Sequence, residues 1–346
     1  GCSRRAEQPA ARNAAQPAAA KPTATARPPA SLPALEDVNV VLIVIDTVGA
    51  EHLSCYGRTL PTSPNLDRLA SEGVRFERAY TTAPWTQPAV ASLLTSLTPS
   101  DHGVRRVLDS LPAERQTLAE LLRERGFRTA GVVSHLVLKA EYGYAQGFDR
   151  YDESAVGDHR AITGHKTTAA AVAALDTLAA SRFFLFVHYF DPHWHYNHHR
   201  AFDFTADYGG RLLPGTEIGR LRAMAKQLTP EDVEYLRRLH GEEIAYTDHF
   251  IGRLVGRLRE LGVADNTLLI VTADHGEEFM RHGWIGHTST LYEELIRVPL
   301  IVHFPRALAP RVVDRPVSTL DVLPTLLGLS RRPAAGRRPT AGWPWS

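Results

Sequence analysis

Apolar runs alternate with amphipathic stretches along most of the chain. Five continuous runs of β-branched and aromatic residues predict buried strands, at 38–45, 127–133, 183–187, 267–272 and 298–303. Helical spacing, together with capping residues and glycine stops, predicts helices at 65–72, 88–97, around 118–122, 166–180 and 229–261. Strands that alternate with helices are typical of an α/β fold with a mainly parallel central sheet flanked by helices.

This periodicity is confined to residues 36–329, which we expect to form one folded domain. Residues 1–35 are rich in Ala and Pro and have few large apolar side chains, which predicts a disordered linker. The start Gly1-Cys2-Ser3 is typical of the cleavage region of a bacterial lipoprotein signal. We therefore expect a lipid on Cys2 that anchors the protein to the bacterial cell envelope. Residues 330–346 predict an irregular tail.

Charge and cysteine content exclude several classes of protein and site. The 346 residues include 39 Lys and Arg against 38 Asp and Glu, for a formal net charge of +1. This balance gives no reason to expect nucleic acid as a partner. With two cysteines there is neither a disulfide framework nor a cysteine-based zinc site, and no run is long and apolar enough to span a membrane.

The first polar residues after several predicted strands form a candidate metal site. Asp46 ends the first strand, and Asp274 and His275 follow the strand at 267–272. The strand at 183–187 is followed by further candidates, His188, Asp191, His193 and His195. Because ligands bind at the carboxyl ends of strands in open α/β sheets, we expect these residues to emerge at one edge. Mixed oxygen and nitrogen ligands suit Zn or Mn better than Ca, which prefers oxygen throughout.

A hydroxyl group stands just ahead of the predicted helix at 88–97, in the stretch APWTQPAVASLLTS that contains Thr86. One interpretation is a helix cap. The other is a nucleophile, because a metal at the strand ends would make the Thr86 hydroxyl easier to deprotonate. The free N–H groups and the positive dipole end of the helix favour a tetrahedral oxyanion such as phosphate or sulfate. The residues together favour metal-assisted attack by Thr86 on a phosphorus or sulfur ester.

Six ordered segments carry a resemblance to a known family. They are VVLIVIDTVGAEHLSCYG, PTSPNLDRLASEGVRFERAYTTAPWTQPAVASLLTSLTPSDHGV, FLFVHYFDPHWHY, EEIAYTDHFIGRLVGRLRELG, NTLLIVTADHGEEF and GHTSTLYEELIRVPLIV. From about residue 38 to 328 the chain resembles the sulfatase family of the alkaline phosphatase superfamily. The resemblance implies an alkaline phosphatase-like fold, with a catalytic domain over 36–329 and a C-terminal subdomain that is truncated in this chain.

The resemblance also implies roles for particular residues. Thr86 falls at the nucleophile position, and the implied metal ligands are Asp46, Thr86, Asp274 and His275. His287 falls where sulfatases carry a Lys that contacts the transferred group. His195 falls near a His that assists the leaving group, so His195 and His287 are expected to be catalytic. A second metal would use Asp191, His195 and His287, since Asp191 and His195 are four residues apart, as some two-zinc relatives space such ligands.

The chain departs from that family at the nucleophile. Sulfatases carry Cys or Ser in a Cys-x-Pro-x-Arg pattern and oxidise it to formylglycine, whereas this chain has Thr86 at that position and Val90 in place of the Arg. Because Thr has an extra methyl group, its oxidation would leave a ketone, so we expect no formylglycine. Thr86 resembles the branch that handles phosphodiesters, phosphonate esters and phospholipid head groups, including phosphoglycerol and phosphoethanolamine transferases.

Three functions therefore stay open at this stage. The first is metal-dependent hydrolysis, or transfer, of a phosphodiester or phosphonate monoester through Thr86. The second is a sulfuric ester hydrolase with an unmodified Thr86. The third is a truncated metal-binding pseudoenzyme. The expected substrate is an ester of a small molecule, a lipid head group or a glycan, and we expect His198 and His199 on the surface.

Overall fold

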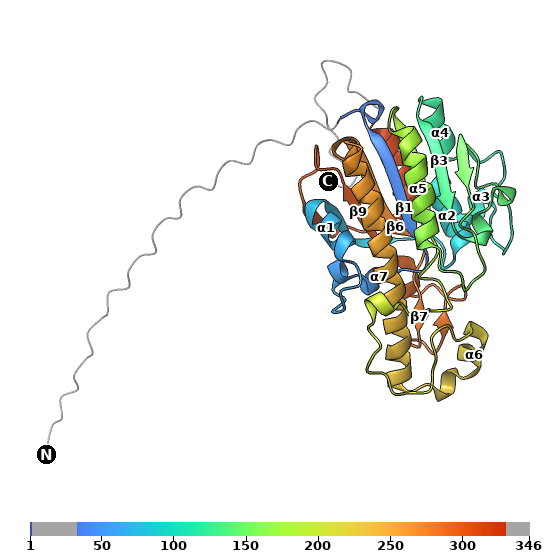
Figure 1. Cartoon of the computed structure of the whole chain (residues 1–346), viewed down its shortest axis with the longest axis vertical. Helices are drawn as coiled ribbons and strands as arrows, with labels where there is room; N and C mark the ends of the chain where they lie inside the picture. The colour runs from blue at the N-terminus through green and yellow to red at the C-terminus, as the bar shows by residue number, and fades with distance from the viewer. Residues whose placement is uncertain (2–32, 330–346) are drawn as a thin grey trace.

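The computed structural model describes Gly1 and residues 33–329 (Figure 1). The predicted lipid site at Cys2, nearly all of the predicted linker and the predicted tail at 330–346 lie outside these residues. Among the described residues, no helix has the length and apolar character needed to cross a membrane.

A nine-stranded sheet forms the centre of the fold, in the order β10-β2-β9-β6-β1-β5-β3-β4, with β11 also paired to β2. The strands are β1 (Asn39–Ile45), β2 (Val74–Tyr80), β3 (Arg128–Val133), β4 (Arg150–Asp152), β5 (Phe183–Tyr189), β6 (Thr267–Ala273), β9 (Arg297–His303), β10 (Arg311–Val313) and β11 (Val317–Ser318). Only β9 among them runs antiparallel to its neighbours, β6 and β2. The predicted α/β fold with a mainly parallel sheet is confirmed.

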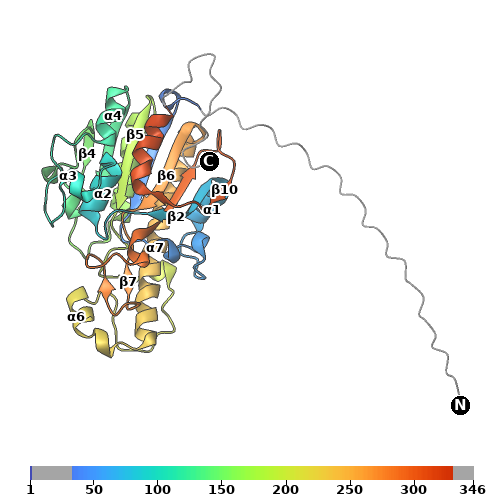
Figure 2. The same cartoon turned by 180° about the vertical axis from the view of Figure 1, so that it is seen from behind.

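Helices cover both faces of this sheet (Figures 1 and 2). One face carries α1 (Pro64–Glu72), α5 (Gly164–Leu178) and the C-terminal half of α7 (Pro230–Glu260), and the other carries α2 (Thr86–Thr95), α4 (Leu118–Glu124) and α9 (Val322–Gly328). Strand β1 is buried along its whole length and supplies both cores, because successive side chains of a strand point to opposite faces. Val41 and Ile43 pack on the α5 and α7 side, whereas Val40 and Leu42 pack on the α2 side.

The sequence pattern missed the strands outside the continuous apolar runs. β2 alternates buried with partly exposed residues, and β4, β10 and β11 are only two or three residues long. Such strands carry little hydrophobic signal of their own, and their pairing with longer neighbours holds them in the sheet.

A smaller lobe lies beyond the carboxyl ends of the parallel strands (Figure 1). It combines the N-terminal half of α7 with α6 (Ile218–Ala223), β7 (Glu278–Phe279) and β8 (Ile285–Gly286), around a third apolar cluster that includes Tyr196, Leu221 and Leu236. Two further short helices complete the fold, α3 (Pro99–His102) and α8 (Glu293–Ile296). The stretch 201–228, for which the sequence pattern predicted neither strand nor helix, contributes α6 to this lobe.

Candidate active site

Parallel pairing brings the polar residues at the ends of β1 and β6 to one place. In the register of these strands Ile45 pairs with Ala273, so the next residues along each strand, Asp46 and Asp274, emerge side by side. His275 follows directly. The prediction that these three residues meet at one edge of the sheet is realised in the structure.

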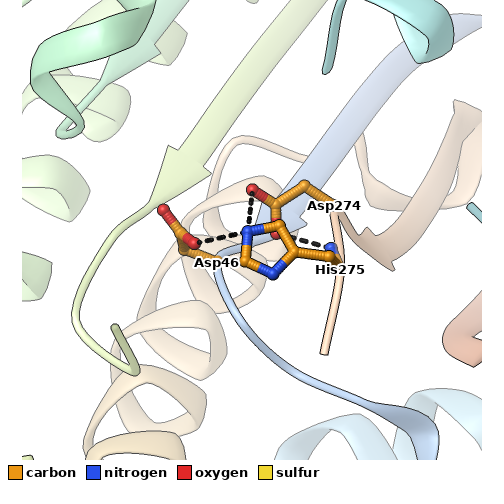
Figure 3. Close-up of side chains that lie close together, drawn as sticks. All are labelled: Asp46, Asp274 and His275. Atoms are coloured by element: carbon orange, nitrogen blue, oxygen red, sulfur yellow. Dashed lines mark hydrogen bonds and ion pairs between the residues drawn. The ribbon is translucent and has the colours of Figure 1, made fainter. Parts of the chain in front are cut away.

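The three side chains form a compact buried group (Figure 3). His275 Nε2 lies 3.5 Å from Asp46 Oδ1 and 3.6 Å from Asp274 Oδ2. All three are buried, and the ligand atoms that they offer lie within 4.8 Å of one another. Asp274 Oδ1 accepts hydrogen bonds from the backbone N–H groups of Thr47 and His275, which fixes the orientation of its carboxylate.

Three carboxylate oxygens of this group lack hydrogen-bond partners in the described part of the chain. Neither oxygen of Asp46, nor Oδ2 of Asp274, has a hydrogen-bond partner among the described residues. Burial raises the pKa of Asp46 well above its usual value, and the charge of Asp274 raises it further. Leaving buried carboxylates unpaired is costly, and a cation between them removes that cost. Two carboxylates and an imidazole are also a donor set that divalent transition metals accept, so the residues fit a metal ion.

Thr86 lies against this group at the start of α2. Its Oγ1 is 3.3 Å from His275 Nε2, and its side chain is buried. The helix begins at Thr86, two residues before the predicted start at 88, and the capping position belongs to Trp85. The interpretation of Thr86 as a helix cap is therefore wrong, because its hydroxyl is turned toward the metal-binding group.

Two more histidines join the site, the predicted candidate His188 and His135, which had no predicted role. His188 Nε2 lies 3.7 Å from Asp46 Oδ2 and from Asp274 Oδ2, and His135 Nε2 lies 3.7 Å from Asp46 Oδ2. β5 continues two residues past the predicted end at 187, so His188 is a fully buried strand residue. A histidine that continues a wholly apolar strand was the signal for it, and His135 had a similar signal, because it stands two residues after the predicted strand at 127–133.

His287 approaches the site from the smaller lobe. Its ring centroid is 4.5 Å from that of His275, and its Nδ1 is 3.1 Å from Glu277 Oε1. Burial lowers the pKa of His287 to about 3, so the ring is neutral and carries one N–H donor and one acceptor nitrogen. His193 and Trp194 pack on the same ring, with centroids 5.0 and 4.2 Å away.

The residues predicted to form a second metal site do not meet in the structure. His195 Nδ1 is 3.5 Å from the backbone oxygen of His159, and its Nε2 has no hydrogen-bond partner among residues 33–329. Both oxygens of Asp191 accept hydrogen bonds at the start of α5, from the backbone N–H groups of Thr163 and Gly164 and the Thr163 hydroxyl. The structure does not bring Asp191, His195 and His287 together as one group of metal ligands.

Buried glutamates on α7 hold the loop that carries these histidines. The Glu242 carboxylate accepts hydrogen bonds from four groups, the backbone N–H groups of His199 and Phe204, the His198 Nδ1 and the Thr205 hydroxyl. Glu243 accepts from Asn197 and bonds His199 Nε2 at 2.6 Å. His199 is thus buried, and its predicted surface position is wrong because a glutamate partner draws the ring inward.

Glu242→Ala is expected to destabilise the fold by about 3 kcal/mol, because it strips the partners from two buried backbone N–H groups. Urea unfolding of both proteins measures the difference in the free energy of unfolding. Glu231→Ala, an exposed change on the same helix, is the control and should stay within about 0.5 kcal/mol of the parent. Equal stabilities for the two variants would contradict the role of Glu242 in anchoring the loop.

Comparison with known proteins identifies the family. The family model described as Sulfatase matches residues 38–331. The chain is 25% identical over 374 residues to N-acetylglucosamine-6-O-sulfatase of Bacteroides thetaiotaomicron, covering 84% of this chain and 67% of that protein. It is 28% identical over 368 residues to human arylsulfatase A, covering 90% of this chain and 66% of that protein. The chain thus spans about two thirds of the length of these relatives.

Solved structures show the same fold. The phosphonate monoester hydrolase SpPMH from Silicibacter pomeroyi matches with a TM-score of 0.67 and 22% identity, over 85% of this chain and 73% of that chain. Because the family model spans nearly all of the described residues, the chain belongs to the sulfatase family of ester hydrolases, in the alkaline phosphatase-like fold.

Proposed function

We propose that this chain hydrolyses phosphonate monoesters or phosphodiesters with the help of a divalent metal, using Thr86 as the nucleophile. The observation that carries the proposal is the Thr86 hydroxyl at the start of α2, 3.3 Å from His275 in the metal-binding group. Asp46, Asp274 and His275 would hold the ion, and their mixed donor set favours Mn or Zn. When bound, such an ion makes a neighbouring hydroxyl more acidic and neutralises charge on the ester oxygens.

The residues around Thr86 supply the rest of the reaction. The Thr86 oxygen forms a bond to phosphorus as the bond from phosphorus to the departing alcohol breaks, which leaves the phosphoryl or phosphonyl group on Thr86. Water then releases that group and restores the hydroxyl. Backbone N–H groups in the first turn of α2 would donate to the oxyanion. His287 and His195 would steady its oxygens or protonate the leaving alcohol.

Sulfate ester hydrolysis is the second candidate, because the curated relatives reported above are named as sulfatases. Two residues make sulfate ester hydrolysis less favourable. Threonine at position 86 cannot yield an aldehyde on oxidation, and Val90 supplies no charge where the family pattern has an Arg. A third candidate is a protein that binds metal without turnover.

A matched panel of aryl esters separates these functions. The purified protein, supplied with Mn or Zn, is given an aryl sulfate, an aryl phosphate monoester, a bis-aryl phosphodiester and an aryl phosphonate monoester. We expect kcat/KM for the diester or the phosphonate to exceed that for the sulfate at least about tenfold, which corresponds to about 1.4 kcal/mol in transition-state stabilisation. A preference for the sulfate would assign the second function. Bound metal without turnover of any ester would assign the third.

A further inference from the structure

A stack of four planar groups runs from the surface of the smaller lobe to the active site. The Arg222 guanidinium contacts two indoles, with its Cζ 4.7 Å from the ring centroid of Trp284 and 5.2 Å from that of Trp194. Trp194 in turn stacks on His287 at 4.2 Å, with 15° between the ring planes. Trp284 keeps 37% of its surface exposed, so it forms the outer end of the stack.

Arg222 also contacts the backbone that leads into His287. Its Nε donates to the backbone oxygen of Ile285 at 2.9 Å, in β8. A Cβ on Gly286 would meet the Arg222 guanidinium, so any other residue there would displace Arg222 from this contact. Gly286 also has a φ of +102°, a conformation that glycine adopts without strain. Arg222 therefore fixes His287 from two sides, through the ring of Trp194 and through the backbone of β8.

The arrangement is rigid because each contact is directional. A guanidinium over an indole contributes about 0.5–2 kcal/mol, depending on how far the pair is removed from water. The two indoles hold the plane of the guanidinium, and the hydrogen bond to Ile285 fixes its position along the strand. On the far side of the imidazole, Glu277 bonds His287 Nδ1, so the His287 ring is held in place on both its face and its edge.

We infer that Arg222, supplied by α6, is a positioning residue that holds His287 in its working orientation through Trp194 and β8. The inference rests on the proposed function in one respect, since it assumes that His287 acts on the ester. The statement that Arg222 orients the His287 imidazole does not depend on the proposed function. Arg222 would thereby connect the short helix α6 to the catalytic chemistry.

Steady-state kinetics of Arg222→Met test this role. The change keeps much of the side-chain length but removes the planar cation and the bond to Ile285. We expect kcat to fall about 10- to 100-fold, because small displacements of a catalytic group are costly, while KM stays within about threefold. Arg222→Lys should recover part of kcat, since a cation over the indoles remains. Arg220→Met, an exposed change on the same short helix, should keep the parent values of both constants.

A spectroscopic readout separates this inference from the proposed function. In protein labelled with ¹⁵N-histidine, the imidazole signals of His287, assigned with His287→Gln, should shift in Arg222→Met and stay in place in Arg220→Met. Trp284→Ala, which removes only the outer indole, should give a smaller shift of the His287 signals in the same direction. This variant tests the inference if Arg222→Met does not fold. Unchanged His287 signals, or a kcat within twofold of the parent, would overturn the inference. Absence of turnover in the parent would instead remove the proposed function, and the His287 signals would still decide the role of Arg222.

Discussion

Replacing Thr86 with alanine is expected to lower kcat by about 10⁴-fold or more on the best ester of the panel, because the change removes the group that forms the bond to phosphorus. Metal binding should survive, since Asp46, Asp274 and His275 remain. Thr86→Ser should keep measurable turnover, because the hydroxyl is retained on a less restrained side chain. Rates measured at saturating substrate, with metal content measured on the same samples, check both expectations.

Thr95→Ala is the matched control for this experiment. Thr95 is also a buried threonine of α2, at the opposite end of the helix, and among the described residues its hydroxyl bonds only the Ala91 backbone oxygen and the Leu97 N–H. We expect it to keep kcat within a few-fold of the parent. Mass spectrometry of quenched turnover should find the phosphoryl or phosphonyl group on the peptide that contains Thr86. Full activity of Thr86→Ala would remove Thr86 from the mechanism.

Asp46→Asn should abolish turnover and weaken metal binding, because it removes a charged ligand from the centre of the site. Metal should raise the Tm of the parent, since an ion that binds only the folded state stabilises it by about 2.7 kcal/mol at a free concentration 100 times Kd. Adding metal should raise the Tm of Asp46→Asn much less than it raises the Tm of the parent. Without metal, Asp46→Asn should unfold at or above the parent's temperature, because the change relieves the repulsion between two buried carboxylates, Asp46 and Asp274.

Thermal unfolding with and without Mn or Zn, after treatment with a chelator, measures these effects. Asp265→Asn, an exposed change just before β6, serves as the control and should follow the parent in both conditions. A parent Tm that does not respond to either metal, or an Asp46→Asn variant that still gains the full shift, would contradict the assignment of the metal site.

Much of the fold and the centre of the site were predictable from local pattern. Strands buried on both faces read as continuous apolar runs, and each of the five predicted runs is a strand of the sheet. Asp46, Asp274 and His275 could be found because a polar residue directly after such a run must emerge at the carboxyl end of a strand. That inference needs only the direction of the chain and the parallel arrangement of the strands.

Other parts of the site could not be predicted, because their neighbours are distant in sequence. The role of Arg222 depends on Trp194, Trp284 and Ile285, which lie on two segments far from Arg222 in the sequence. The order of the strands likewise places β9 between β2 and β6, a pairing that no local pattern specifies. The hydrogen bonds of Asp191 to Thr163 and Gly164 also connect residues far apart along the chain.

The sequence by itself determined the α/β class, the residues at the strand ends and a hydroxyl at the start of a helix, because each depends on hydrophobic spacing within a few residues. Only the tertiary structure decided that Thr86 faces the metal-binding group instead of capping α2, and that His188 and His135 approach Asp46. The physical reason is that a side chain's chemistry depends on what surrounds it after burial. In this molecule those surroundings come from strands and loops that meet only when the sheet has formed.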